Sequence, residues 1–174
     1  MPYAAPPDPA RLFLALWPSP ATRDGVIAWR NARPWPEGAA LVAPEKLHMT
    51  LHFLGDVPRT RVAELSAGLA VRVEPFELAF DRVEIWSNGI AALRPIVAPV
   101  RALQLHSALR DALQRLDLAT ETRPFRPHVT LARRAQDAMS MALDEPVRWR
   151  VREYVLVESQ RGAGGGYRVL RSYA

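Results

Sequence analysis

The chain has 174 residues, of which 49% are hydrophobic, and this fits one domain or two small lobes with a shared core. It has no cysteine, which excludes disulfides, thiolate nucleophiles and cysteine-ligated zinc. The net charge of +5 is carried almost wholly by arginine and favours an anionic partner such as RNA. Since no apolar run is long enough for a membrane span and no signal-peptide pattern is present, we expect no membrane contact and a cytoplasmic location.

The first half of the chain alternates short strands and helices. Residues 1–10 hold four prolines and predict a loose tail. The elements expected after it are, in chain order, a strand at 11–17, a helix at 20–30, a strand at 47–54, a helix at 62–73 and a strand at 76–86. The second helix is predicted because Val62, Leu65, Leu69 and Val73 recur at steps of three and four.

The second half repeats this order. The elements expected there are a strand at 90–94, a helix at about 99–116, a strand at 125–132, a short helical stretch at 136–143, and strands at 147–157 and 167–172. We interpret residues 11–174 as one domain built from an internal repeat, roughly 11–86 and 90–157. The predicted fold class is α+β, with two pseudo-symmetric lobes of mostly antiparallel sheet and helices packed outside.

The second strand of each half carries the same short motif, LHMTL at 47–51 and PHVTL at 127–131. Because side chains alternate along a strand, His48 and Thr50 share one face, as do His128 and Thr130. An approximate twofold axis would set the two pairs on opposite sides of a central cleft. Two acid/base groups with two hydroxyl donors suit the chemistry of a phosphodiester.

Four segments of the chain resemble the two-histidine (2H) phosphoesterase superfamily, in particular its RNA 2′,3′-cyclic phosphodiesterase branch, also called 2′-5′ RNA ligases. They are RLFLALWPSP at 11–20, LHMTLHFLGDV at 47–57, RPFRPHVTLAR at 123–133, and Ser159 followed by GYRVL at 166–170. The resemblance implies hydrolysis of an RNA 2′,3′-cyclic phosphate to a 2′-phosphate. It also implies that His48 donates the proton and that His128 is the base.

The reaction needs a group that takes a proton from water and another that protonates the leaving ribose oxygen. Histidine suits both roles because its ordinary pKa of about 6.5 lies near the working pH. Thr50 and Thr130 are expected to stabilise the phosphate oxygens as hydroxyl donors. This set requires no cofactor and no metal, and the residue chemistry alone leaves open which histidine is the acid.

Further candidates surround the two motifs. Arg133 is a possible phosphate ligand, although strict alternation places it on the apolar face unless the strand ends or twists first. Arg126 shares the face of His128 in a regular strand and is a possible RNA ligand. Phe13 is either a core residue or a ring on which a base stacks. His52 is expected at the cleft edge, as a possible substrate contact rather than a catalyst.

Three other functions compete with hydrolysis. Ligation of a 2′,3′-cyclic end to a 5′-hydroxyl end differs only in the nucleophile. A non-catalytic RNA-binding module would explain the charge but not the paired motifs, and a metallohydrolase would need a third ligand. The expected partners are RNA ends or small cyclic nucleotides, with no obligate protein partner. His106, on the predicted helix at 99–116, is expected to be a solvated residue.

Overall fold

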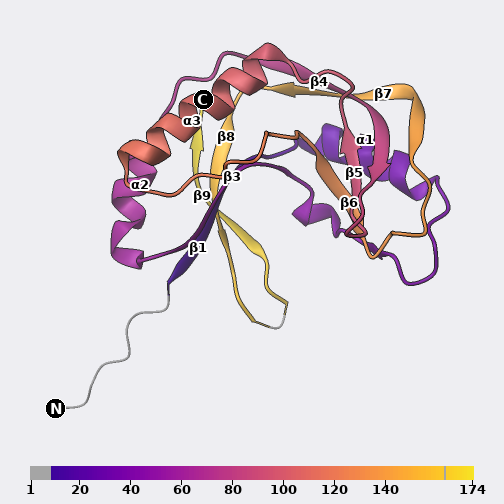
Figure 1. Ribbon diagram of the computed structural model, residues 1–174, viewed down its shortest axis with the longest axis horizontal. Coiled ribbons are helices and arrows are strands. Elements are labelled where there is room, and N and C mark those ends of the chain that lie inside the picture. The colour runs from indigo at the N-terminus through magenta and orange to yellow at the C-terminus, as the bar shows by residue number, and fades with distance from the viewer. Residues whose placement is uncertain (1–8, 163) are drawn as a thin grey trace.

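The computed structural model describes residues 9–162 and 164–174 as two antiparallel sheets flanked by helices (Figure 1). Most of the predicted tail, residues 1–8, lies outside the described residues, and Ala10 already belongs to the first strand. The elements are β1 (Ala10–Leu16), α1 (Pro20–Asn31), β2 (Ala40–Leu41), η1 (Pro44–Lys46), β3 (Met49–Val57), η2 (Arg59–Arg61), α2 (Val62–Gly68), β4 (Phe76–Ile85), β5 (Ala91–Arg94), α3 (Val100–Arg115), β6 (Val129–Arg133), β7 (Met141–Val151), β8 (Tyr154–Ser159) and β9 (Tyr167–Tyr173).

The two sheets have the strand orders β3-β1-β8-β9 and β2-β6-β5-β4-β7. The orders match strand for strand once the short edge strand β2 is left aside. Each His-x-Thr strand, β3 or β6, lies beside the first strand of its own half, β1 or β5. The last strand of each half, β4 or β8, crosses to the other sheet, so that β8 pairs with β1 and β4 pairs with β5. The predicted α+β fold with two pseudo-symmetric lobes is confirmed, but each lobe is built from both halves of the chain.

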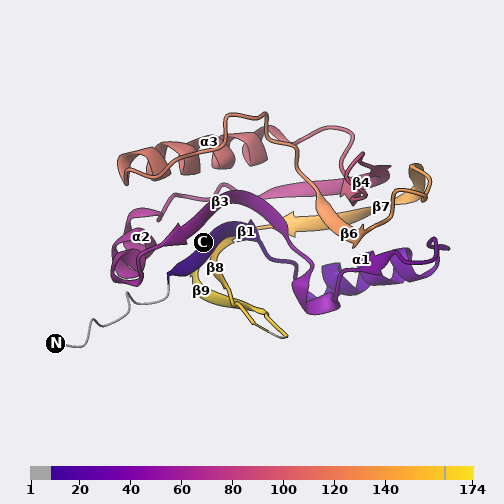
Figure 2. The ribbon, with the colours of Figure 1, turned by 60° about the horizontal axis from the view of Figure 1, so that its bottom comes forward.

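The two longer helices cross over in the same way. Helix α1 follows β1 yet contacts β7 of the other sheet, and α3 follows β5 yet contacts β3. Figure 2 shows α3 above β3 and α1 below β7. Ser19 caps α1 by accepting a hydrogen bond from the main-chain N–H of Thr22, with Pro20 at the first helical turn.

A β-bulge interrupts each His-x-Thr strand just after the threonine. In β3, Thr50 pairs with Ala15 and His52 with Leu14, which leaves Leu51 without a partner. In β6, Thr130 pairs with Ala92 and Ala132 with Ala91, which leaves Leu131 without one. A bulge places two consecutive residues opposite one and reverses the alternation beyond it.

The reversal decides which side chains reach the face of the two histidines. Leu51 and His52 are both buried, and Phe53 returns to the face of His48 and Thr50. In β6 the same shift turns Arg133 to the face of His128 and Thr130. These bulges are a local feature that strict alternation does not predict.

The second predicted helix is wrong in length: α2 ends at Gly68 instead of continuing to residue 73. The side chain of Tyr154 explains this end, because its hydroxyl donates to the carbonyl of Leu69 (2.6 Å) and accepts from the N–H of Val71 (2.7 Å). These main-chain groups are thereby satisfied without further helical turns. Leu69 and Val73 are buried in the connection that follows.

Two predictions in the second half are also wrong. The helical stretch at 136–143 is a turn that leads into β7, whose first residue, Met141, pairs with Val83 of β4. The strand expected at 147–157 is divided at 152–153, so that its first part belongs to β7 and its second to β8. One predicted strand thus supplies residues to both sheets, and periodicity along the chain does not show such a division.

Candidate active site

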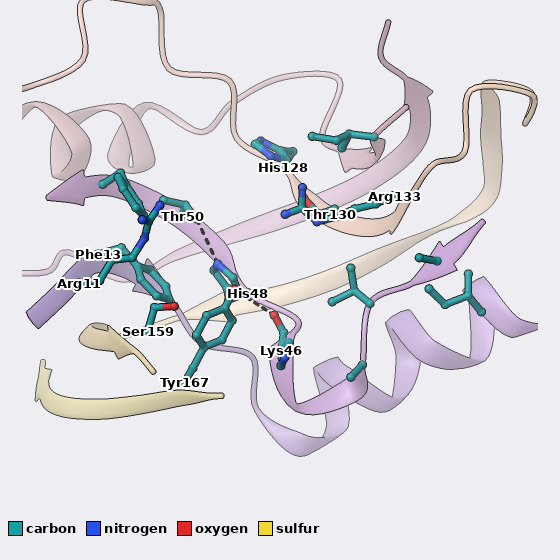
Figure 3. A pocket seen from close by; sticks show the side chains of 16 residues that line it. Arg11, Phe13, Lys46, His48, Thr50, His128, Thr130, Arg133, Ser159 and Tyr167 are labelled. Carbon is teal, nitrogen blue, oxygen red and sulfur yellow. Dashed lines mark hydrogen bonds between the residues drawn. The ribbon is translucent and has the colours of Figure 1, made fainter. Parts of the chain in front are cut away.

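A cavity of about 690 Å³ lies between the two His-x-Thr strands, and both histidines line it (Figure 3). Four of the predicted site residues meet there from matching positions at the starts of β3 and β6, where each histidine directly precedes its strand: His48, Thr50, His128 and Thr130. Ser159 and Tyr167, which face each other across β8 and β9, line the side next to His48.

The ring of His48 is fixed by two hydrogen bonds. Its Nδ1 lies 2.7 Å from the main-chain carbonyl of Lys46, and because a carbonyl only accepts, Nδ1 carries the proton. Its Nε2 lies 3.1 Å from the hydroxyl of Thr50, which donates to it when the ring is neutral. The reactive nitrogen is therefore Nε2, on the cavity side.

The ring of His128 is held in the same manner. Its Nδ1 donates to the carbonyl of Arg126, 2.7 Å away and again two residues earlier in the chain. Both imidazoles thus present Nε2 as the group that accepts or donates a proton. This is the arrangement that a paired acid and base require.

Aromatic side chains pack against both imidazoles. Trp17 stacks on His48 with ring centroids 5.5 Å apart and an interplanar angle of 13°, and Tyr167 meets the same ring edge-on at 5.2 Å. Phe13, only 3% exposed, approaches His48 at 5.0 Å. Trp86 packs on His128 at 4.5 Å. Phe13 lines the cavity, but its almost fully buried ring packs against His48, which favours the core alternative over a ring on which a base stacks.

Burial and positive charge both lower the pKa of the two histidines. Desolvation is the largest cause for each ring, and it is partly offset by the hydrogen bond to the main-chain carbonyl. The charge of Arg133 lowers the pKa of both rings, while Arg94 and Arg126 act on His128 alone. A phosphate bound between the rings would oppose these effects, because an anion favours the protonated imidazole.

The two arginines predicted near the site, Arg126 and Arg133, lie in different places. Arg133 lies in the cavity because of the bulge in β6. The guanidinium of Arg126 instead lies over the ring of Trp86 (4.6 Å) and bonds to Glu84 (3.2 Å), beside a neighbouring cavity.

The expectation for His106 is wrong, whereas His52 stays a possible substrate contact, in the wall of the neighbouring cavity. The bulge turns His52 away from the first cavity, so that its side chain is 5% exposed and lines the neighbouring cavity, and its Nε2 donates to the carbonyl of His106 (2.8 Å). His106 is 8% exposed rather than solvated. Its ring lies between those of His52 (4.0 Å) and Phe125 (4.1 Å).

The sequence reasoning missed Lys46 and Phe53, which also line the cavity. Lys46 stands two residues before His48, as Arg126 stands before His128, and its ammonium group donates to the carbonyl of Gly165 (2.7 Å). Phe53 stands five residues after His48, as Arg133 does after His128. An alignment of the two motifs position by position would have identified both residues.

Two further observations concern metal sites and membrane-spanning helices in the part of the chain that the structure describes. Within residues 9–162 and 164–174, no group of three or more histidine, aspartate or glutamate side chains is placed to bind a metal ion. None of the helices in these residues is long and apolar enough to cross a membrane.

The chain is similar to known proteins over most of its length. A family model described as the 2′-5′ RNA ligase superfamily matches residues 18–163. The RNA 2′,3′-cyclic phosphodiesterase of Escherichia coli is 35% identical over 77% of each chain, and that of Thermus thermophilus is 31% identical over 94% of this chain and 89% of its own. The crystal structure of E. coli LigT complexed with 3′-AMP superposes with a TM-score of 0.86 at 31% identity, covering 96% of this chain and 98% of that one.

Proposed function

Because the chain belongs to the 2′-5′ RNA ligase superfamily, we propose that it hydrolyses 2′,3′-cyclic phosphate ends of RNA to 2′-phosphomonoesters. The single observation that carries the proposal is the pair of imidazole Nε2 atoms, each fixed by an Nδ1–H to a carbonyl two residues earlier and each facing one cavity. A module that only bound RNA would not need both histidines to be held in the tautomer that leaves Nε2 free to accept a proton.

In the proposed reaction, neutral His128 takes a proton from water as its oxygen attacks phosphorus. The bond from phosphorus to the ribose O3′ breaks, and protonated His48 gives its Nε2 proton to that oxygen. The assignment of acid and base follows the family resemblance. Thr50, Thr130 and Arg133, which line the same cavity, stabilise in this proposal the negative charge that builds on the non-bridging oxygens.

Ligation would use the same groups with a ribose 5′-hydroxyl in place of water. In both cases RNA ends or nucleotides are the partners, and an RNA-directed activity in a chain without cysteine fits a cytoplasmic location.

The test is incubation of an oligonucleotide with a 2′,3′-cyclic phosphate end, with and without a 5′-hydroxyl oligonucleotide, in the presence of a chelator. We expect a product that is one water heavier and carries a 2′-phosphate, read by mass and by phosphatase sensitivity. His48→Ala and His128→Ala should each lower the rate about 10²–10⁴-fold, as loss of a general acid or base does.

An intact cyclic end would refute the proposal. A joined product would make ligation the activity. A need for a divalent ion would favour the metallohydrolase, and a 3′-phosphate product would reverse the orientation of the cyclic ring in the cavity.

A further inference from the structure

A second cavity, of about 500 Å³, adjoins the first on the side of His128. Thr50, Phe53 and His128 line both cavities, so the two are continuous at these residues. A cavity of either size is within the range that binds small molecules. The proposed reaction at a single cyclic nucleotide occupies the first cavity and leaves the second without a role.

The second cavity carries positive charge. Arg123 and Arg126 line it, against a single carboxylate, Glu121. Glu121 bonds to Arg123 at 3.3 Å, but both side chains are exposed. An exposed ion pair contributes little free energy, so a phosphate can take the place of Glu121 beside Arg123 at little cost.

The positive charge of Arg126 is only partly neutralised by its carboxylate partner. It shares the carboxylate of Glu84 with Arg82 and Arg94, so three guanidinium groups face one anion. Arginine is well suited to bind phosphate because its planar group donates two parallel hydrogen bonds.

An aromatic ring lies beside these charges. Phe125 is half-buried, with its ring stacked on His106 at 4.1 Å and 13°, and it lines the second cavity. An unpaired base stacks readily on such a ring. Phosphate-binding arginines beside an aromatic ring are what a nucleotide of single-stranded RNA requires.

We propose that the second cavity binds the nucleotide that precedes the cyclic end, with its connecting phosphodiester near Arg123 and Arg126. The proposal rests on the proposed function, and it makes the terminal dinucleotide of an RNA strand, rather than a free cyclic mononucleotide, the preferred substrate. The preceding nucleotide brings a phosphate with it, which a free nucleoside with a 5′-hydroxyl does not.

The test compares kcat/KM for adenosine 2′,3′-cyclic phosphate with that for the adenylyl-adenosine dinucleotide ending in the same group. The protein should use the dinucleotide at least tenfold better. Arg123→Glu should reduce that ratio about tenfold, mainly through the KM for the dinucleotide, because the reversed charge repels the connecting phosphate.

Arg72→Glu is the matched control. Arg72 is an exposed arginine paired with a glutamate two residues away, as Arg123 is, and it lines neither cavity. It should leave the ratio unchanged.

Equal use of the two substrates by the unaltered protein, or an Arg123→Glu effect no larger than that of Arg72→Glu, would overturn the subsite alone. Failure to open either substrate would instead overturn the proposed function, and the subsite with it. Stimulation by a free 5′-hydroxyl nucleoside, with joining of the two, would assign the second cavity to the acceptor of a ligation instead.

Discussion

At the level of single residues, the two histidines differ from ordinary ones in burial and in the charge around them. Each imidazole is tied through Nδ1 to a main-chain carbonyl, and each has a lowered pKa. The sequence predicted both residues from the repeated motif, because a strand places His and Thr on one face. It could not predict the pKa shifts, since the burial that causes them depends on residues such as Trp17 and Trp86 far away in the chain.

The shifts predict the dependence of activity on pH. One histidine must be neutral and the other protonated, so kcat/KM should follow a bell-shaped curve. Because the pKa of both rings is lowered in the free protein, the maximum of kcat/KM should lie below pH 6.5. The maximum of kcat should lie at higher pH, because bound phosphate favours the protonated imidazole. Initial rates with a cyclic dinucleotide between pH 4.5 and 9 check this, and a kcat/KM maximum above pH 7 would contradict it.

A second pH effect should appear in stability rather than in activity. Burial lowers the pKa of His106 to about 4, whereas the unfolded chain has its ordinary value of about 6.5. The unfolded state therefore binds the proton first, so stability is full above pH 6.5 and falls as the pH drops from 6.5 towards 4. The contribution of one such proton is at most about 1.4 kcal/mol per pH unit.

The variant His106→Phe keeps a ring between His52 and Phe125 but removes the proton-binding site. Urea unfolding at pH 4, 5, 6 and 7 should give a shallower fall of the unfolding free energy for this variant than for the natural sequence. If the unfolding free energy fell equally with pH in both proteins, protonation of His106 would not be the cause of the fall.

At the level of elements, the bulges in β3 and β6 shape the site. They bring Phe53 and Arg133 to the first cavity and turn His52 away from it, towards the second cavity. Period-two alternation predicted the histidines and threonines correctly because they precede the bulge, and it failed for His52 because that residue follows it. A bulge depends on how a strand pairs with its neighbour, which one strand's sequence does not contain.

The bulge in β6 predicts different roles for two adjacent arginines. Arg133 lines the cavity and Arg134, in the left-handed region at φ 53°, does not. Arg133→Ala should raise KM for a cyclic phosphate about tenfold or more, since a hydrogen bond to a charged group contributes about 1.5–3 kcal/mol. It should also move the kcat/KM maximum to higher pH, because the charge of Arg133 lowers the pKa of both histidines.

Arg134→Asn is the control, because asparagine tolerates the left-handed conformation. It should leave both KM and the pH maximum near their original values. Equal effects of the two substitutions would mean that the reversal of alternation in β6 does not direct Arg133 to the substrate.

At the level of the whole molecule, the two halves of the chain interlock. The sequence indicated a repeat and the resulting pseudo-symmetry, but not that β4 and β8 change sheets. Nothing in the local sequence shows whether the next strand stays in its sheet or crosses to the other one: residues 147–157 are interrupted only by Arg152 and Glu153, and their division between β7 and β8 was missed for this reason.

Interlocking predicts that the molecule unfolds as one cooperative unit. Leu156, fully buried in β8, pairs with Leu14 of β1, so it joins the second half of the chain to the sheet of the first. Leu156→Ala should cost about 2–5 kcal/mol, as buried leucine truncations do. It should lower the unfolding free energy measured by amide hydrogen exchange equally in β1 and in β5, although β5 lies in the other sheet. Leu103→Ala, at a half-exposed position of α3, should change neither by more than about 1 kcal/mol. A loss of protection confined to β1 and β8 would show instead that each sheet unfolds independently. The exchange of strands would then join the two lobes without coupling their unfolding.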